Sequence, residues 1–285
     1  MFSVKTGQVT CKSKTMRYPQ WTCFAAILAL AMPAQADPAK LITIRQGDMP
    51  IILSAPHGGR QAIPDVPPRK GGHVAEFKTV RDENTAELTE LLAKELEKRL
   101  HAKPYLVIAR FERKYVDVNR PEKDAFESAQ AKCYYQAYHQ ALFDFTKDVQ
   151  KKWKRGTLLD IHGQAERPQA LVRGTNNGQT VELLLKRYGR TALTGPKSIF
   201  GVFAGAGFEV FPPIDSDEKE DKRFIGGHIV RTYGSHQGHG IDAIQLEFGS
   251  IFREKAKLAQ TAAILAEAID FFSREYLSEA FKPPK

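Results

Sequence analysis

The feature of this sequence that most constrains its fold is the alternation of short apolar runs with longer amphipathic segments. Runs rich in β-branched residues predict strands at 41–44, 51–55, 105–109, 115–118, 157–161, 229–232 and 241–248. Apolar residues at helical spacing predict helices at 85–101, 124–155, 180–188 and 254–272. Strands that alternate with helices predict an α/β fold in which helices cover both faces of one sheet.

Residues 1–36 have the pattern of a secretory signal peptide. Arg17 precedes an apolar run from 21 to 32, and an Ala-Gln-Ala sequence ends the segment. The run is shorter than the roughly 20 helical residues that span a bilayer. We therefore expect a periplasmic or secreted protein with no membrane anchor after cleavage. A buried N-terminal helix is the alternative, and both Met1 and Met16 are open as the translation start.

Cleavage would leave residues 37–285 as one domain, since no internal repeat or long linker divides them. This stretch retains Cys133 alone, so an internal disulfide is excluded and the fold depends on its apolar core. The formal charge of +9 falls to +5 when the four cations of residues 1–36 are removed. Such a mild surplus suits an anionic substrate, and it excludes the basic stripe of a nucleic-acid-binding protein.

Three polar residues lie at the carboxyl ends of predicted strands. His57 follows the run 51–55, His162 follows the run 157–161, and Glu247 lies near the end of 241–248. Ligands of α/β sheets gather beyond the carboxyl ends of the strands, so we expect these side chains to converge. Two histidines and a carboxylate form a common catalytic zinc set, and a nearby glutamate can accept a proton from water. The sequence therefore predicts a hydrolytic metal site.

The acid that completes the metal set is left open by the residues themselves. Asp82 and Glu83 stand just before the helix predicted at 85–101. Either can bind a metal from there, and either can instead cap the helix. Asp160 shares a strand face with His162, so it can orient that ligand or pair with an arginine.

The stretch that begins at Arg113 is a candidate anion-binding segment. Strand alternation puts Asp117 and Asn119 on one face, and Arg120 precedes a proline, where the chain stays extended. A guanidinium beside an amide can hold a carboxylate through two parallel hydrogen bonds, and a structural Arg–Asp pair is the alternative. Arg231, in the last predicted strand but one, is a second candidate contact for an anion.

Several other mechanisms lack their motifs. The Gly-x-Ser-x-Gly elbow of serine hydrolases, the His-Glu-x-x-His helix of zincins, the P-loop and the dinucleotide-binding fingerprint are all absent. Cys133 lies within the helix predicted at 124–155. No helix N-terminus activates it there, so we expect it to pack rather than react.

Several motifs occur in the order found in N-formylglutamate amidohydrolases, and the chain resembles that family over roughly residues 50–250. The motifs are Pro56-His57-Gly58-Gly59, Asp82 before a helix, Arg113 with Asp117-x-Asn119-Arg120-Pro121, Asp160-x-His162, Gly226-Gly227 with Arg231-x-Tyr233-Gly234, and Gln245-Leu246-Glu247. The resemblance implies a phosphorylase/hydrolase-like fold similar to zinc carboxypeptidases. In that fold, residues 37–285 form a single three-layer catalytic domain with a mixed, mostly parallel β-sheet between helices.

The resemblance also implies roles for individual residues. It implies that a Zn²⁺ ion is held by His57, Asp82 and His162, with Glu247 as the general base. Four further residues are implied to hold a substrate carboxylate: Arg113, Asn119, Arg120 and Arg231.

Two departures from the family bear on these expectations. Carboxypeptidases place a metal-binding glutamate three residues after the first histidine, where this chain has Arg60, so the choice between Asp82 and Glu83 stays open. Formylglutamate hydrolysis belongs to cytoplasmic histidine breakdown, whereas this chain carries an export pattern. The leading hypothesis is therefore an exported zinc-dependent hydrolase of a C–N amide bond, acting on a small carboxylate-bearing amide or peptide. The alternatives are a periplasmic zinc carboxypeptidase or peptidoglycan amidase, and a non-enzymatic carboxylate-binding protein.

Overall fold

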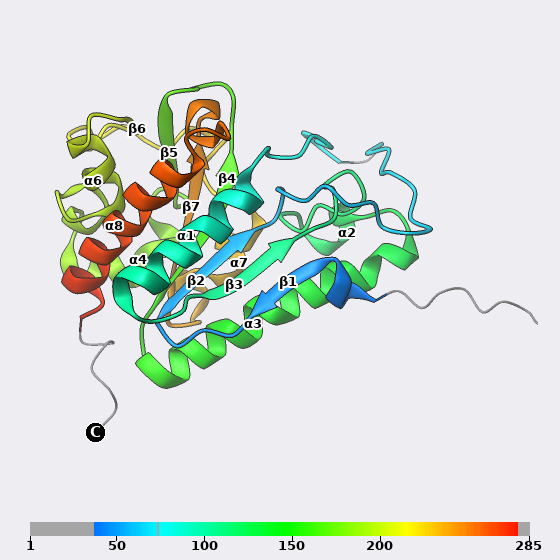
Figure 1. Ribbon diagram of the computed structural model, residues 1–285, viewed down its shortest axis with the longest axis horizontal. Helices are drawn as coiled ribbons and strands as arrows, with labels where there is room; N and C mark the ends of the chain where they lie inside the picture. The colour runs from blue at the N-terminus through cyan, green and yellow to red at the C-terminus, as the bar shows by residue number, and fades with distance from the viewer. Residues whose placement is uncertain (1–36, 73, 279–285) are drawn as a thin grey trace, which may run out of the picture. The chain divides into compact units, whose positions relative to one another are not determined.

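The computed structural model describes residues 37–72 and 74–278, which contain one seven-stranded sheet (Figure 1). The strands are β1 Ile42–Arg45, β2 Ile51–Ala55, β3 Tyr105–Ala109, β4 Thr157–Gly163, β5 Ala170–Gly174, β6 Glu209–Phe211 and β7 Asp242–Phe248. Their order across the sheet is β1-β3-β2-β4-β7-β5-β6. The predicted signal peptide, residues 1–36, lies outside the described residues.

The sheet is mixed and mostly parallel. Strands β3, β2, β4 and β7 run parallel to one another in the centre, and β6 is parallel to β5. Strand β1 pairs antiparallel with β3, and β5 pairs antiparallel with β7. The fold class that the sequence indicated is therefore confirmed. Parallel neighbours bring their carboxyl ends to one edge, so the ends of β2, β4 and β7 lie next to one another.

Helices cover both faces of this sheet and produce three layers. They are α1 Thr85–Leu100, α2 Glu122–Ala125, α3 Lys132–Trp153, α4 Glu182–Tyr188, α5 Thr191–Thr194, α6 Ile199–Gly205, α7 His228–Tyr233 and α8 Leu258–Tyr276. Helices α1, α6 and α8 pack on one face against Leu53 and Leu159, whereas α3 and α7 pack on the other against Ile52 and Leu158. Consecutive strand residues thus enter opposite layers, as the two-residue period requires. Figure 1 shows α1 beside α8, and α3 along the opposite side of the sheet.

Two of the predicted strands are wrong. The segment 115–118 forms a turn, because the Asp117 amide donates to the Ala125 carbonyl (2.9 Å) instead of to a neighbouring strand. The segment 229–232 lies in helix α7, whose Ile229 amide donates to the side-chain oxygen of Asn119 (2.8 Å). In both segments a hydrogen bond to a group outside the sheet, on Ala125 in the first and on Asn119 in the second, outweighs the local β-propensity.

The limits of other elements also differ from the prediction. The helix predicted at 124–155 is divided, because α2 ends at Ala125 and Phe126 has extended backbone before α3. Strands β5 and β6 fall outside the predicted elements, since five and three residues carry little periodic signal. In the part of the chain that the structure describes, no helix is both long enough and apolar enough to cross a bilayer.

Asp242, at the first position of β7, makes the stability of the fold depend on pH. Burial raises the pKa of its carboxyl to about 6 from 3.8, although the Leu184 amide donates to Oδ1 (3.2 Å). Between these two values the folded protein binds more protons than the unfolded chain. The free energy of unfolding therefore falls as the pH rises through this window, and no further loss from this group follows above it.

We predict that Asp242→Asn gains stability relative to wild type as the pH rises. The gain in the free energy of unfolding should be about 2 kcal/mol between about pH 4.5 and about pH 7.5, at ~1.4 kcal/mol per pKa unit. Asparagine removes the buried charge and keeps the oxygen that accepts from Leu184. Urea unfolding of both proteins at both pH values measures the difference. An equal difference between the two proteins at the two pH values would contradict the assignment.

Candidate metal centre

The three predicted strand ends meet at one edge of the sheet. Strands β2, β4 and β7 are neighbours, and His162 on β4 lies directly opposite Glu247 on β7 in the parallel register. His57 follows the end of β2 by two residues. All three side chains are buried. The convergence that the sequence predicts is therefore present in the structure.

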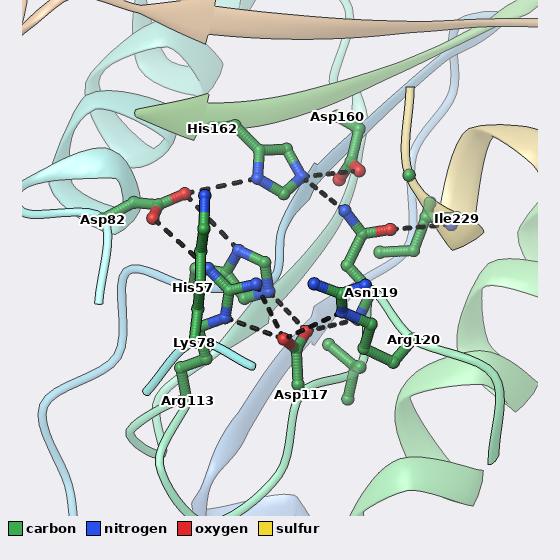
Figure 2. Close-up of polar contacts among 12 residues, drawn as sticks. His57, Lys78, Asp82, Arg113, Asp117, Asn119, Arg120, Asp160, His162 and Ile229 are labelled. Atoms are coloured by element: carbon green, nitrogen blue, oxygen red, sulfur yellow. Dashed lines mark hydrogen bonds and ion pairs between the residues drawn. The ribbon is translucent and has the colours of Figure 1, made fainter. Parts of the chain in front are cut away.

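His57, Asp82 and His162 form a group that could hold a metal ion (Figure 2). One possible ligand atom from each residue lies within 4.8 Å of the other two. Asp82 Oδ2 is 3.2 Å from His162 Nδ1 and 3.4 Å from His57 Nδ1. The two imidazole rings are inclined at 77°, with their centroids 4.8 Å apart. Two imidazole nitrogens and one carboxylate oxygen are donors that suit zinc.

The outer nitrogen of each imidazole is held by a carboxylate. His57 Nε2 is 2.7 Å from Asp117 Oδ1, and His162 Nε2 is 2.9 Å from Asp160 Oδ2. Because an ionised carboxylate accepts, each Nε2 can donate a ring proton to its partner, and the Nδ1 atom of each ring lies toward Asp82. Among the described residues, the buried His57 Nδ1 finds no hydrogen-bond partner. Two Nδ1 atoms and a carboxylate face one another here, and a bound cation would accept a lone pair from each of the three, so these residues fit a metal ion.

Asp82, rather than Glu83, faces the two histidines. The Asp82 amide donates to the His57 carbonyl (3.0 Å), and Asp82 Oδ2 accepts from the Gly163 amide (3.1 Å). Glu83 is exposed and pairs with Arg81 (2.8 Å). Burial opposes a charge on Asp82, but the two imidazoles hold its pKa well below its usual range. The geometry thus selects the acid that the sequence left open.

Arg113 forms a structural pair with Asp117, which was the alternative to substrate binding. Its Nε and Nη2 atoms lie 2.8 Å and 2.7 Å from Asp117 Oδ2, and its Nη1 is 3.9 Å from Asp82 Oδ1. Although burial opposes the charge, Arg113 and His57 hold the pKa of Asp117 well below its usual range. Asp117 is therefore a permanent acceptor for His57. The sequence shows no sign that Asp117 pairs with His57, because 60 residues separate these two partners.

Glu247 lies beside the metal group, with Oε1 4.0 Å from His162 Nδ1. Gln245, two residues earlier on the same face of β7, donates to this Oε1 (2.8 Å). Burial raises the pKa of Glu247, against the opposing attraction of His162. A carboxylate whose pKa is raised toward neutrality is a stronger proton acceptor, which suits a general base.

A cleft of about 980 Å³ lies over the metal group, and the four predicted substrate-binding residues all line it. Arg120 donates to the Glu76 carbonyl (3.0 Å) and lies 3.8 Å from Asp117 Oδ2. Arg231 is exposed on α7, and its guanidinium forms no ion pair with a described residue. His228, on the same helix, also lines the cleft. The sequence analysis missed His228 because a strand was predicted there.

Asn119 connects the turn that carries Asp117 to other parts of the site. Its Oδ1 accepts from the Ile229 amide (2.8 Å), and its Nδ2 lies 3.2 Å from His162 Nε2 and 3.5 Å from Gln245 Oε1. Figure 2 shows Asn119 between His162 and Ile229. The amide of Asn119 is therefore engaged with the protein itself, although its side chain borders the cleft.

Comparisons with known proteins bear on the fold. No family model and no curated protein matches the chain. Among solved structures, an N-formylglutamate amidohydrolase from Ralstonia eutropha JMP134 is similar at a TM-score of 0.56 and 16% identity, over 82% of this chain and 98% of that one. The chain shares the fold of that amidohydrolase. A gene product of Agrobacterium tumefaciens is similar at a TM-score of 0.54 and 16% identity, over 85% of this chain and 96% of that one. The resemblance drawn from the motifs is thus confirmed at the level of the fold.

We predict that Asp117→Asn weakens zinc binding about 10–100-fold, because residues that orient a metal-binding histidine contribute about this much to affinity. Asparagine can donate to His57 Nε2 as well as accept from it, so the imidazole is no longer restricted to one tautomer. Competition with a chromophoric chelator measures the affinity. Asp148→Asn, a change far from the cleft on α3, is the control. Equal zinc affinity in all three proteins would show that Asp117 does not orient His57.

Proposed function

We propose that this protein is a zinc-dependent hydrolase that cleaves a C–N amide bond in a substrate bearing a carboxylate. The observation that carries the proposal is the meeting of two buried Nδ1 atoms with Asp82, next to the buried Glu247. The similar structure from Ralstonia eutropha is an N-formylglutamate amidohydrolase, which supports the same class of reaction. Zinc is the proposed ion because three protein ligands leave a fourth position open for chemistry.

Glu247 is the proposed general base. Zinc held by His57, Asp82 and His162 supplies a Lewis acid for the amide carbonyl and makes water more acidic. Glu247 accepts a proton from water as the water oxygen attacks the carbonyl carbon. Glu247 then returns this proton to the nitrogen as the C–N bond breaks, so the products are a carboxylic acid and an amine. Gln245 keeps Glu247 Oε1 in place through its hydrogen bond.

Arg231 and Arg120 are the proposed contacts for the substrate carboxylate. Both line the cleft, and Arg231 has a guanidinium that the described part of the protein leaves unpaired. Arg113 has two of its nitrogens on Asp117, so we assign it to holding the site together. A carboxylate bound away from the reacting bond fixes the orientation of the amide, which lowers the entropic cost of reaching the transition state.

We place this activity in the periplasm or outside the cell. The proposal is supported by the export pattern of residues 1–36. A substrate met there is a peptide or a cell-wall fragment rather than formylglutamate. The cleft of about 980 Å³ has room for such a larger molecule.

We predict that Glu247→Gln retains zinc and loses about 10²–10⁴-fold in kcat, because glutamine cannot accept the proton. His162→Ala should lose both zinc and activity. Metal analysis and hydrolysis of formylglutamate, peptides and cell-wall fragments, with and without chelator, measure both properties. Full turnover by Glu247→Gln would remove it as the base. Binding of these compounds by the zinc-loaded wild type without any hydrolysis would show a carboxylate-binding protein instead.

We predict that Arg231→Met raises KM about 10-fold or more and leaves kcat nearly unchanged, since a hydrogen bond to a charged group contributes about 1.5–3 kcal/mol. The preferred substrate of the preceding experiment is used. Arg187→Met, an exposed arginine on α4 outside the cleft, is the control. An unchanged KM in Arg231→Met would place the substrate carboxylate elsewhere.

A further inference from the structure

The three proposed metal ligands are positioned by different parts of the fold. His162 lies within β4 and His57 follows β2, so pairing between neighbouring parallel strands fixes both. Asp82 comes instead from the loop before α1, and Asn84 in this loop has a left-handed φ of 61°. Strand pairing cannot position Asp82, so contacts between the loop and the strand ends must do so.

Arg253 joins this loop to the ends of two strands. Its Nε donates to the Phe248 carbonyl (3.0 Å), its Nη2 to the Gln164 carbonyl (3.1 Å), and its Nη1 to the Glu83 carbonyl. The residue is 8% exposed. The accepting carbonyls follow three members of the site by one or two positions: Glu247, His162 and Asp82, respectively. One side chain therefore connects the three segments that carry the proposed base and two of the proposed ligands.

The loop and Arg253 each donate a hydrogen bond to the other. Asn84 Nδ2 donates to the Arg253 carbonyl (2.8 Å), while Arg253 donates to the carbonyl of Glu83. A guanidinium offers five N–H groups in one plane and can reach three carbonyls at once, whereas an ammonium group has a single nitrogen.

Gly163 provides the space for this guanidinium. A Cβ at position 163 would lie 2.4 Å from Arg253 Cζ and 2.5 Å from its Nε. The Gly163 amide also donates to Asp82 Oδ2 (3.1 Å). The same glycine therefore contacts the Asp82 carboxylate through its amide and allows Arg253 to approach through its missing side chain.

We propose that Arg253 is a positioning residue that holds Asp82 against the two histidines and thereby sets the metal affinity of the site. The inference rests on the proposed metal-dependent function. Without the guanidinium, the Glu83 carbonyl loses its partner, and the loop is held near the strand ends by fewer contacts, those of Asp82 with the Gly163 amide and the His57 carbonyl among them. His57 and His162 keep their places because their strands remain paired.

The first test compares Arg253→Met with Arg173→Met. Arg173 is equally buried, at 6%, and donates to Glu220, but it lies on β5 outside the cleft. Chelator competition measures the zinc affinity, and urea unfolding of the metal-free proteins measures stability. Both variants should lose stability. We expect the zinc Kd to rise about 10–100-fold in Arg253→Met and to stay unchanged in Arg173→Met. An unchanged Kd in Arg253→Met, or an equal rise in both variants, would overturn the proposal.

A second pair of variants applies if Arg253→Met does not fold. Gly163→Ala displaces the guanidinium while every charge is kept, and Gly205→Ala is its control because a Cβ there meets open space. The zinc Kd should rise in Gly163→Ala and stay unchanged in Gly205→Ala. Equal affinity in these two proteins would overturn the proposal.

A measurement on metal-free protein separates this inference from the proposed function. The side-chain ¹⁵N NMR signals of His162 report on the contact of Nδ1 with the Asp82 carboxylate. We expect these signals to shift in Arg253→Met and to stay in place in Arg173→Met, whether or not the wild type binds zinc. Failure of the wild type to bind zinc would overturn the proposed function alone. Unshifted His162 signals in Arg253→Met would overturn the role of Arg253.

Discussion

Two buried hydrogen bonds between a carboxylate and an imidazole decide what chemistry this protein can perform. Asp117 and Asp160 each accept from the Nε2 of a histidine, which leaves the Nδ1 atoms, both of which face Asp82, as the ligand atoms for a metal ion. Buried carboxylates are costly unless cations compensate them. Three guanidinium groups lie within 4 Å of Asp117 Oδ2, and they belong to Arg69, Arg113 and Arg120. These guanidinium charges therefore keep the buried Asp117 carboxylate ionised. The Asp117 carboxylate in turn keeps His57 in the tautomer that a metal requires.

The sheet positions some residues of this site, and the loops position the others. Parallel pairing places His162 opposite Glu247 without help from any loop. The loop that carries Asp82 reaches the end of β2 because α1 packs closely on Gly58, where a Cβ would lie 2.4 Å from the Ala86 amide. Rigid strands thus define two corners of the site, and close contacts between a helix start and a turn define the third. Such a division is common in α/β enzymes, where loops at strand ends carry function on a fixed scaffold.

The class of fold and the strand ends could be predicted because they follow from local patterns. Apolar runs with few polar interruptions indicate strands buried on both faces, and a polar residue that ends such a run lies at the edge of the sheet. His57, His162 and Glu247 each end or follow such a run. Where an apolar run covers only a few residues, its pattern does not reliably predict the secondary structure. The four residues of 229–232 have strand propensity but lie in a helix, whose Ile229 amide donates to Asn119 instead of to a neighbouring strand.

The sequence by itself determined the α/β class and which histidines and glutamate come together, since local periodicity shows where strands end and the carboxyl ends of parallel strands lie at one edge of a sheet. It did not distinguish Asp82 from Glu83, because adjacent residues of the same chemistry differ only in the direction of their side chains. The tertiary structure decided that question through the His57 carbonyl and the Gly163 amide, which hold Asp82. It also decided the pairing of Asp117 with His57. Contacts of this kind join segments far apart in the chain, and no spacing along one segment records them.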